Sequence, residues 1–253
     1  MAEALAGLHR VELIMGTAIS VDIADDLPPS ELTRLADEAF DWFRLVDARF
    51  STYKADSDVS RLGRRERRLA DCAPETGAVL DRCAELWLAT EGYFDVYAAG
   101  SLDPSGYVKG WAVEVASDRL ADAGAVNHCV NAGGDVRVRG RRAPGQPWRV
   151  GVRHPWQQTA VCWVVVGTDL AIATSGTYER GCHVVDPHRG VPARELRSVT
   201  VVGPDLGVAD AYATAALAMG TGGLDWLSAL DGHECAVVQD DGRCFRSAEL
   251  PVV

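Results

Sequence analysis

Lysine is nearly absent from this chain of 253 residues, although the chain holds 25 basic side chains. Only Lys54 and Lys109 are lysines, so 25 − 2 = 23 of the basic residues are arginines. Acidic residues number 36, which gives a formal charge of 25 − 36 = −11. No basic surplus is therefore available for the phosphates of nucleic acids or for anionic lipids, and we expect neither nucleic-acid nor membrane partners.

Other absences narrow the class of protein further. No window of 18 apolar residues occurs, which excludes a conventional membrane-spanning helix. The N-terminal residues lack the basic region of a secretory signal, and Glu12 interrupts the apolar stretch that follows them. The seven cysteines are odd in number and contain no C-x-x-C pair, which argues against a disulfide framework or a zinc knuckle. We therefore expect a cytoplasmic protein with reduced thiols.

What the sequence does contain is typical of a globular protein, with 47% hydrophobic and 24% charged residues. No linker or internal repeat divides it, so residues 1–253 are expected to form a single domain. Apolar residues from Leu32 to Val46 follow helical spacing, and Ser30 is a plausible N-cap for that helix. Similar patterns predict helices over about 75–90, with Trp87 on its buried stripe, and over about 107–123 and 208–219.

Strand patterns dominate the second half of the chain. One strand is expected near the N-terminus, over 11–23, and another over 198–203. Turn residues predict three hairpins, joining 136–139 to 148–152, 162–166 to 170–174, and 236–239 to 244–247. Early helices followed by hairpins indicate an α+β fold. The Arg-rich stretch up to about residue 72 is expected to be a loop.

Two glycine-containing clusters could bind a ligand. The segment from Asp103 to Gly110 opens a predicted helix, where free backbone amides and the ammonium of Lys109 suit a phosphate. Lys109 could equally pair with an acidic neighbour such as Asp103, and the segment could be a plain capping loop. The second cluster runs from Asn131 to Asp135, and its paired glycines permit either close approach to a ligand or a simple β-turn.

Two further clusters supply oxygen atoms. The segment from Thr174 to Arg180 holds several hydroxyl groups at the end of an apolar strand, without a hydrolase elbow. Asp210 and Thr214 are four residues apart on a predicted helix, so both side chains project from one face. Their hard oxygen atoms suit Mg²⁺. The alternative is an aspartate that stabilises the first helical turn and a threonine packed in the core.

In their order along the chain, these motifs resemble those of the ApbE-type FAD:protein FMN transferases. The matching segments span roughly residues 11–220 and comprise Met15-Gly16-Thr17, Ser51-Thr52-Tyr53, Gly92 to Asp95, Leu102 to Gly110, Asn131 to Asp135, Thr174-Ser175-Gly176, His183 to Pro187 with Gly190, and Ala209 to Thr214. The resemblance implies a two-lobed α+β fold with FAD in a cleft between the lobes. It also implies a Mg²⁺-dependent enzyme that transfers FMN from FAD to a threonine or serine hydroxyl of an acceptor protein and releases AMP.

The resemblance also assigns roles to individual residues. The FAD contacts that it implies are Met15, Tyr93, Phe94, Asp95, Asp103, Lys109, Thr174, Ser175, Gly176, His183 and Val184. It implies Mg²⁺ ligands at Asp210, Thr214 and the backbone carbonyl of Gly106. Either Asp186 or Asp210 could help to deprotonate the acceptor hydroxyl, and the sequence does not choose between them.

One departure from the family pattern affects the expected chemistry. The family's stretch between the Phe-Asp turn and the Leu-Asp motif is reduced here to residues 96–101, and the usual lipoprotein leader is also absent. A shortened wall would leave the flavin site more open. Two alternatives to transfer therefore stay open, namely hydrolysis of FAD to FMN and AMP, and FAD binding without turnover.

Overall fold

The computed structural model describes residues 7–157, 159–177 and 184–253. Its centre is a sheet of eight strands in the order β1-β2-β3-β4-β7-β10-β11-β12, with antiparallel pairing throughout. The strands of this sheet are β1 Leu8–Ile14, β2 Thr17–Ile23, β3 His128–Ala132, β4 Asp135–Arg139, β7 Asp169–Gly176, β10 Leu196–Gly203, β11 Glu234–Gln239 and β12 Cys244–Arg246. Two ribbons lie outside it, formed by β5 Trp148–Arg153 with β6 Val161–Gly167, and by β8 Val185–Asp186 with β9 Val191–Pro192.

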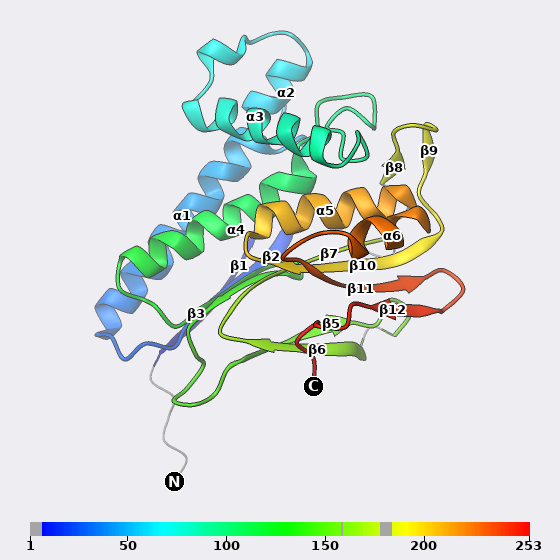
Figure 1. Cartoon of the computed structure of the whole chain (residues 1–253). Coiled ribbons are helices and arrows are strands. Elements are labelled where there is room, and N and C mark those ends of the chain that lie inside the picture. Colours follow the sequence, from blue (N-terminus) through cyan, green and yellow to red (C-terminus); the bar gives the residue numbers. More distant parts are fainter. Residues whose placement is uncertain (1–6, 158, 178–183) are drawn as a thin grey trace.

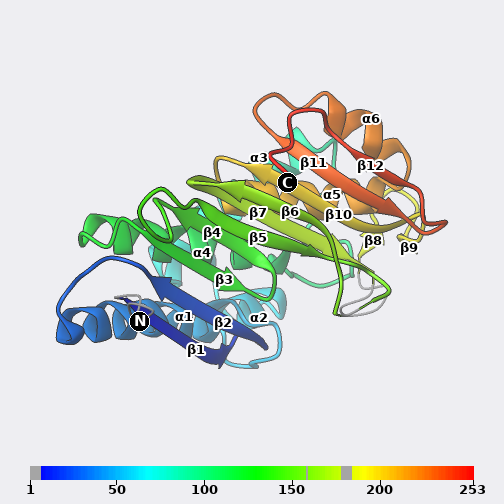
Figure 2. The same cartoon turned by 90° about the horizontal axis from the view of Figure 1, so that it is seen from below.

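The helices gather on one face of the sheet, and the β5–β6 ribbon lies against the other (Figures 1 and 2). The helical elements are α1 Pro29–Phe50, α2 Asp58–Gly63, the 3₁₀ helix η1 Leu69–Asp71, α3 Pro74–Ala89, α4 Ser105–Asp122, α5 Leu206–Met219 and α6 Gly222–Ser228. The main core fills the space between helices and sheet, and a smaller core around Val138 and Trp148 lies beneath the ribbon. The α+β expectation is confirmed. Within the described residues, no helix is both long enough and apolar enough to cross a membrane.

The longest helix follows its sequence pattern closely. Every apolar residue of the predicted stripe between Leu32 and Val46 is buried. The predicted N-cap at Ser30 is wrong, because the helix already begins at Pro29. Proline is favourable at this first position, since its fixed φ is helical and no intrahelical bond requires its missing N–H.

Strand pairing differs from the prediction in several places. The single strand expected over 11–23 is a hairpin, because Met15 and Gly16 adopt φ of 56° and 72° and reverse the chain. Two left-handed residues in succession are typical of the tight turn that suits the twist of a hairpin. The predicted pairings of 136–139 with 148–152 and of 162–166 with 170–174 are wrong, since β4 pairs with β7 while β5 pairs with β6. The hairpin of β11 and β12 around Asp241-Gly242 is confirmed.

The helical segments after α1 agree with the prediction except at three points, one of which is the short helix α6 Gly222–Ser228, where no helix was predicted. The Arg-rich stretch contains the short helix α2 and η1, where only a loop was expected. Trp87 was placed on the buried stripe of α3 but is 47% exposed, whereas Val79, Cys83 and Leu86 of the same helix are buried. Trp87 therefore lies at the border of the buried face.

Candidate active site

A cavity of about 620 Å³ opens where the β1–β2 turn, the end of β7, the start of α4 and the middle of α5 meet. It is lined by residues from segments that are far apart in the sequence: Gly16, Thr17, Ala18, Tyr93, Phe94, Asp95, Val96, Ala98, Ala99, Asp103, Ser105, Gly106, Lys109, Gly133, Arg153, Thr174, Ser175, Gly176, Val184, Val185, Asp210 and Thr214. The clusters that the sequence places at the ends of helices and strands therefore converge on one space.

Three charged side chains form an ion cluster beside this cavity, and two of them, Lys109 and Asp210, line it. The Lys109 ammonium contacts the carboxylate of Asp135 and lies 3.3 Å from Asp210 Oδ2. Asp135 is 1% exposed and Asp210 is 3% exposed, so the lysine neutralises carboxylates that are largely out of reach of water. Asp103, which the sequence offers as an alternative partner of Lys109, instead accepts a hydrogen bond from the backbone N–H of Ser105 at 3.0 Å.

Close packing of α4 on α5 creates this cluster. A β-carbon at Gly110 would lie 2.4 Å from the carbonyl oxygen of Leu206 and 3.0 Å from the β-carbon of Asp210. Only glycine therefore permits this approach of the two helices. The Gly110 N–H donates a hydrogen bond to Asp210 Oδ2 at 3.1 Å, which fixes the carboxylate beside the neighbouring Lys109.

A second ion network, buried behind the cluster, holds the same elements together. Glu114 on α4 accepts a hydrogen bond from the N–H of Leu206 at 2.9 Å, at the start of α5. Its other oxygen accepts from Arg137 Nε on β4 at 2.8 Å. The three residues of the ion cluster lie on the same three elements, namely Lys109 on α4, Asp210 on α5 and Asp135 on β4. Glu114 therefore connects the elements that carry the cluster.

Oxygen atoms surround the ion cluster on the side of α5. Thr214 lies one helical turn after Asp210, and its hydroxyl shares a hydrogen bond of 3.1 Å with Ser175 Oγ. A β-carbon at Gly106 would lie 3.2 Å from Thr214 Oγ1, so the first turn of α4 lies directly against this hydroxyl. One carboxylate, hydroxyl groups and nearby backbone form a donor set that fits Mg²⁺, which keeps several waters and shares its shell with phosphate.

An aromatic turn forms the opposite wall. The Thr90 hydroxyl accepts a hydrogen bond from the N–H of Phe94 at 3.0 Å, and the Phe94 side chain is buried. The ring of Tyr93 packs against the ring of His188, with 4.4 Å between centroids. The N–H of Asp103 donates to the carbonyl of Val96 at 2.7 Å and closes the short 96–101 segment over the start of α4. This segment contributes Val96, Ala98 and Ala99 to the cavity.

Most residues that the sequence singles out are brought together. Tyr93, Phe94, Asp95, Asp103, Gly106, Lys109, Thr174, Ser175, Gly176, Val184, Asp210 and Thr214 all line the cavity. Met15 does not line it, although the next residue does, and its side chain packs against the core. Asp186 is also outside the lining, and its Oδ1 accepts hydrogen bonds from the N–H groups of His188 and Arg189 in the β8–β9 turn. His183 lies outside the described residues.

Sequence reasoning missed Arg153 in the cavity lining, and it missed the role of Asp135, which pairs with Lys109 but does not itself line the cavity. Asp135 stood in a recognised glycine cluster, but it meets Lys109 through the packing of α4 on β4, which local sequence patterns do not reveal. Its Oδ1 accepts a hydrogen bond from the N–H of Thr174 on β7 at 3.0 Å. Arg153 reaches the cavity from the end of β5, and no local pattern marks it. Gly133, by contrast, belongs to the recognised glycine cluster, and a β-carbon there would lie 2.5 Å from Thr17 Oγ1.

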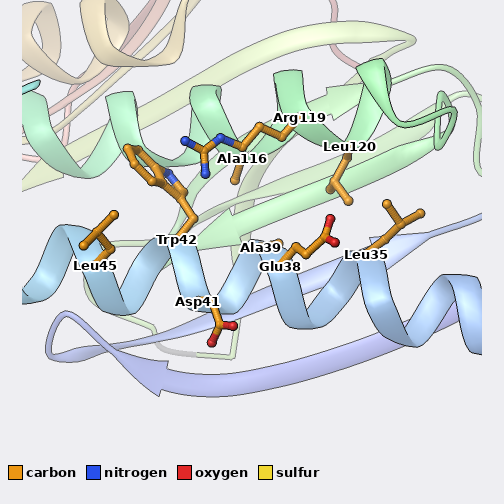
Figure 3. Close-up of a pocket in the computed structure, with 9 residues that line it drawn as sticks. All are labelled: Leu35, Glu38, Ala39, Asp41, Trp42, Leu45, Ala116, Arg119 and Leu120. Carbon is orange, nitrogen blue, oxygen red and sulfur yellow. The ribbon is translucent and has the colours of Figure 1, made fainter.

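A separate groove of about 440 Å³ runs between α1 and α4 (Figure 3). The Arg119 guanidinium lies over the Trp42 ring at 4.1 Å from its centroid. The acidic residues along the groove already have partners, because Glu38 pairs with Arg34 and Asp41 pairs with Arg44. The groove therefore offers no charge for a ligand comparable to the ion cluster.

Comparisons with known proteins find relatives of this chain by sequence. The sequence model of the ApbE family matches residues 15–101 and 98–237. A curated FAD:protein FMN transferase of Vibrio cholerae is 36% identical over 129 residues, which cover 47% of this chain and 39% of that protein. Another, from Haemophilus influenzae, is 25% identical over 274 residues, covering 81% of this chain and 79% of that protein.

Solved structures share the fold. The flavin transferase ApbE of Vibrio cholerae superposes with a TM-score of 0.83 and 24% identity, covering 98% of this chain and 99% of that one. An ApbE protein of Thermotoga maritima gives a TM-score of 0.80 at 22% identity, covering 96% and 97%. The match to the family falls into two pieces that overlap at residues 98–101, within the segment that the motif resemblance predicts to be shortened.

Proposed function

This chain belongs to the ApbE family, and from that membership we propose that it transfers FMN from FAD to a hydroxyl group of an acceptor protein, releasing AMP. The curated relatives named FAD:protein FMN transferases support this activity, although the aligned part spans only 39% and 31% of the length of two of them. The observation that carries the proposal is the convergence of Lys109, Asp210, Thr214 and Gly106 in one cavity.

The cavity has the chemistry that FAD requires. At the start of α4, the N–H of Gly106 and the Lys109 ammonium lie beside the cavity, where they would suit the pyrophosphate once Mg²⁺ balances the carboxylate of Asp210. Tyr93 and Phe94 provide aromatic surface for the rings of the substrate. The polar ends of β7, at Thr174 and Ser175, supply hydroxyl groups between these two regions.

Magnesium is the cofactor that these residues would hold. Asp210, Thr214 and the carbonyl of Gly106 are the proposed ligands, with water and phosphate oxygens completing the shell. When bound, Mg²⁺ would neutralise the negative charge that builds up on the pyrophosphate as its bridge breaks. Lys109 would hold the same charge from the side of α4, next to Asp135.

The proposed transfer is a single displacement at phosphorus. The acceptor hydroxyl oxygen, from threonine or serine, forms a bond to the phosphorus of the FMN half, and the bond from that phosphorus to the bridging oxygen breaks. AMP leaves with the bridging oxygen, and the hydroxyl proton passes to a carboxylate and then to solvent. Asp210 and Asp186 are the candidate carboxylates, and the position of Asp210 in the cavity lining favours it.

Hydrolysis is the second candidate reaction, with water in place of the acceptor hydroxyl. The short 96–101 segment motivates it, because this part of the cavity wall is formed by the small side chains of Ala98 and Ala99 next to Val96. FAD binding without turnover is the third. These alternatives predict different products from FAD in the absence of an acceptor, namely FMN with AMP or intact FAD.

The proposed function is tested by mass spectrometry. The protein is incubated with FAD, Mg²⁺ and a purified protein that the Vibrio cholerae relative flavinylates. We expect the acceptor to gain the mass of one FMN and an equal amount of AMP to appear. Asp210→Asn should abolish the adduct, whereas Asp225→Asn, at an exposed position of α6, should leave it unchanged. AMP release without adduct would establish hydrolysis, and intact FAD with equal behaviour of both variants would overturn the enzyme assignment.

A further inference from the structure

Strand β1 is an edge of the large sheet with an open row of backbone groups. It pairs with β2 on one side, and within the described ranges no strand pairs with its other side, as Figure 2 shows. The β1–β2 turn has two residues, so the flanking pair Ile14 and Thr17 exchanges both of its backbone hydrogen bonds. Hydrogen-bonded and non-hydrogen-bonded residue pairs alternate along an antiparallel ladder. The N–H and C=O groups of Val11 and Leu13 therefore point away from β2, toward the open side.

The side chains at these positions are apolar and exposed. Val11 is 50% exposed and Leu13 is 85% exposed, on the face of β1 that points away from α1. The opposite face carries Arg10 and Glu12, whose charges pair with Asp37 and Arg44 of α1. Natural edge strands are usually protected by proline, bulges or outward charges, yet β1 contains no proline and keeps a regular register.

This apolar edge continues directly into the cavity. Leu13 lies opposite Ala18 in the β1–β2 register, so both side chains occupy the same face. Ala18 lines the cavity, and its carbonyl accepts a hydrogen bond of 3.1 Å from the N–H of Gly133, which lines it too. A row of small and apolar groups therefore leads from the outer edge of the sheet to two residues that line the cavity.

We propose that β1 is the docking edge for the acceptor protein, and that an extended segment of the acceptor adds as a further strand beside Val11 and Leu13. This inference rests on the proposed function, since FMN transfer requires a polypeptide hydroxyl to enter the cavity. Strand addition uses the outward backbone groups for affinity and the exposed side chains for selectivity. The acceptor segment would carry apolar residues at alternate positions, beside the threonine or serine that receives FMN.

Amide hydrogen exchange resolved by residue tests the docking edge without relying on catalysis. In the free protein, the amides of Val11 and Leu13 should exchange rapidly, while those of Glu12 and Ile14, bonded to β2, exchange slowly. Adding the acceptor protein used above should protect Val11 and Leu13 selectively. Protection that grows with the concentration of the enzyme alone would instead show pairing with a second copy and would overturn the proposal.

Two substitutions at Leu13 give an independent kinetic readout. Leu13→Pro removes an outward N–H and leaves the bonds to β2 intact, whereas Leu13→Asp keeps the backbone and charges the surface. Both should raise KM for the acceptor at least about tenfold, the scale of a central interface residue, with FAD affinity unchanged. Leu88→Asp is the matched control, since Leu88 is 71% exposed on α3.

The results separate this inference from the proposed function. If the wild type flavinylates the acceptor while both Leu13 variants keep its KM and the β1 amides stay unprotected, the docking edge is refuted and the transferase activity stands. If the wild type forms no adduct with any acceptor protein, the proposed function fails, and the inference that depends on it fails too.

Discussion

Replacing Lys109 by methionine tests the ion cluster most directly. Methionine is also unbranched, but it removes the ammonium from between Asp135 and Asp210. Both carboxylates are almost fully buried, so water cannot solvate them once the ammonium is removed. Removing one partner of a buried ion pair costs about 3–5 kcal/mol. Because the Lys109 side chain is 23% exposed, we expect a loss at the lower end, about 3 kcal/mol of the free energy of unfolding.

Urea unfolding at pH 7 with linear extrapolation measures this loss. The other lysine of the chain provides the control, because Lys54 is 46% exposed and pairs with Asp47 at 2.5 Å on the surface. Lys54→Met should cost less than about 1 kcal/mol, as surface ion pairs do. Added Mg²⁺ should recover part of the loss in Lys109→Met, since a divalent cation beside Asp210 replaces the ammonium. Equal and small losses in the two variants would refute the role given to the cluster.

Two further predictions concern the support of the site. Burial lowers the pKa of His128 to about 4 from its ordinary 6.5, and its ring is held by Ser117 Oγ at 2.6 Å. Between these pH values the unfolded chain binds the proton more readily than the folded one. The free energy of unfolding should therefore fall by up to about 3 kcal/mol as the pH drops from 7 to 4. In His128→Gln, the free energy of unfolding should depend less steeply on pH over this range. Gly110→Ala should destabilise the protein by more than about 2 kcal/mol, because its β-carbon meets the Leu206 carbonyl, and should weaken FAD binding. Gly77→Ala in α3 has open space and should stabilise by up to about 1 kcal/mol, so equal melting temperatures for the two alanine variants would contradict this packing argument.

Local sequence patterns were sufficient to predict those parts of the fold and the site that lie within one helix or one hairpin. The spacing of Asp210 and Thr214 predicts their shared helix face, whereas only the family resemblance joined them to Lys109 at the start of another helix. The tight turn at Asp241-Gly242 likewise determined its hairpin. These features could be predicted because they depend on residues close together in the sequence or on the order of the motifs along the chain.

The pairing of the strands could not be predicted from local sequence patterns. The turn residues after β4 and after β6 suggested local hairpins, but β4 and β7 have helices on one face and the β5–β6 ribbon on the other. Burial on both faces favours pairing of these two strands with each other inside the large sheet. The role of Asp135 beside Lys109 and the place of Arg153 in the cavity were missed because both depend on contacts between elements that are far apart in the sequence.

The position of the β5–β6 ribbon has a consequence for how such a site can diversify. The chain leaves the large sheet at Arg139 and returns at Asp169, and these two residues are cross-strand neighbours. The intervening residues therefore form an insertion whose ends already meet, and the order of the sheet does not depend on its length. It cannot simply be deleted, because it covers the core around Val138. Its sequence can vary, however, and since it carries Arg153 into the cavity, such variation would change this part of the cavity lining while the ion cluster keeps its geometry.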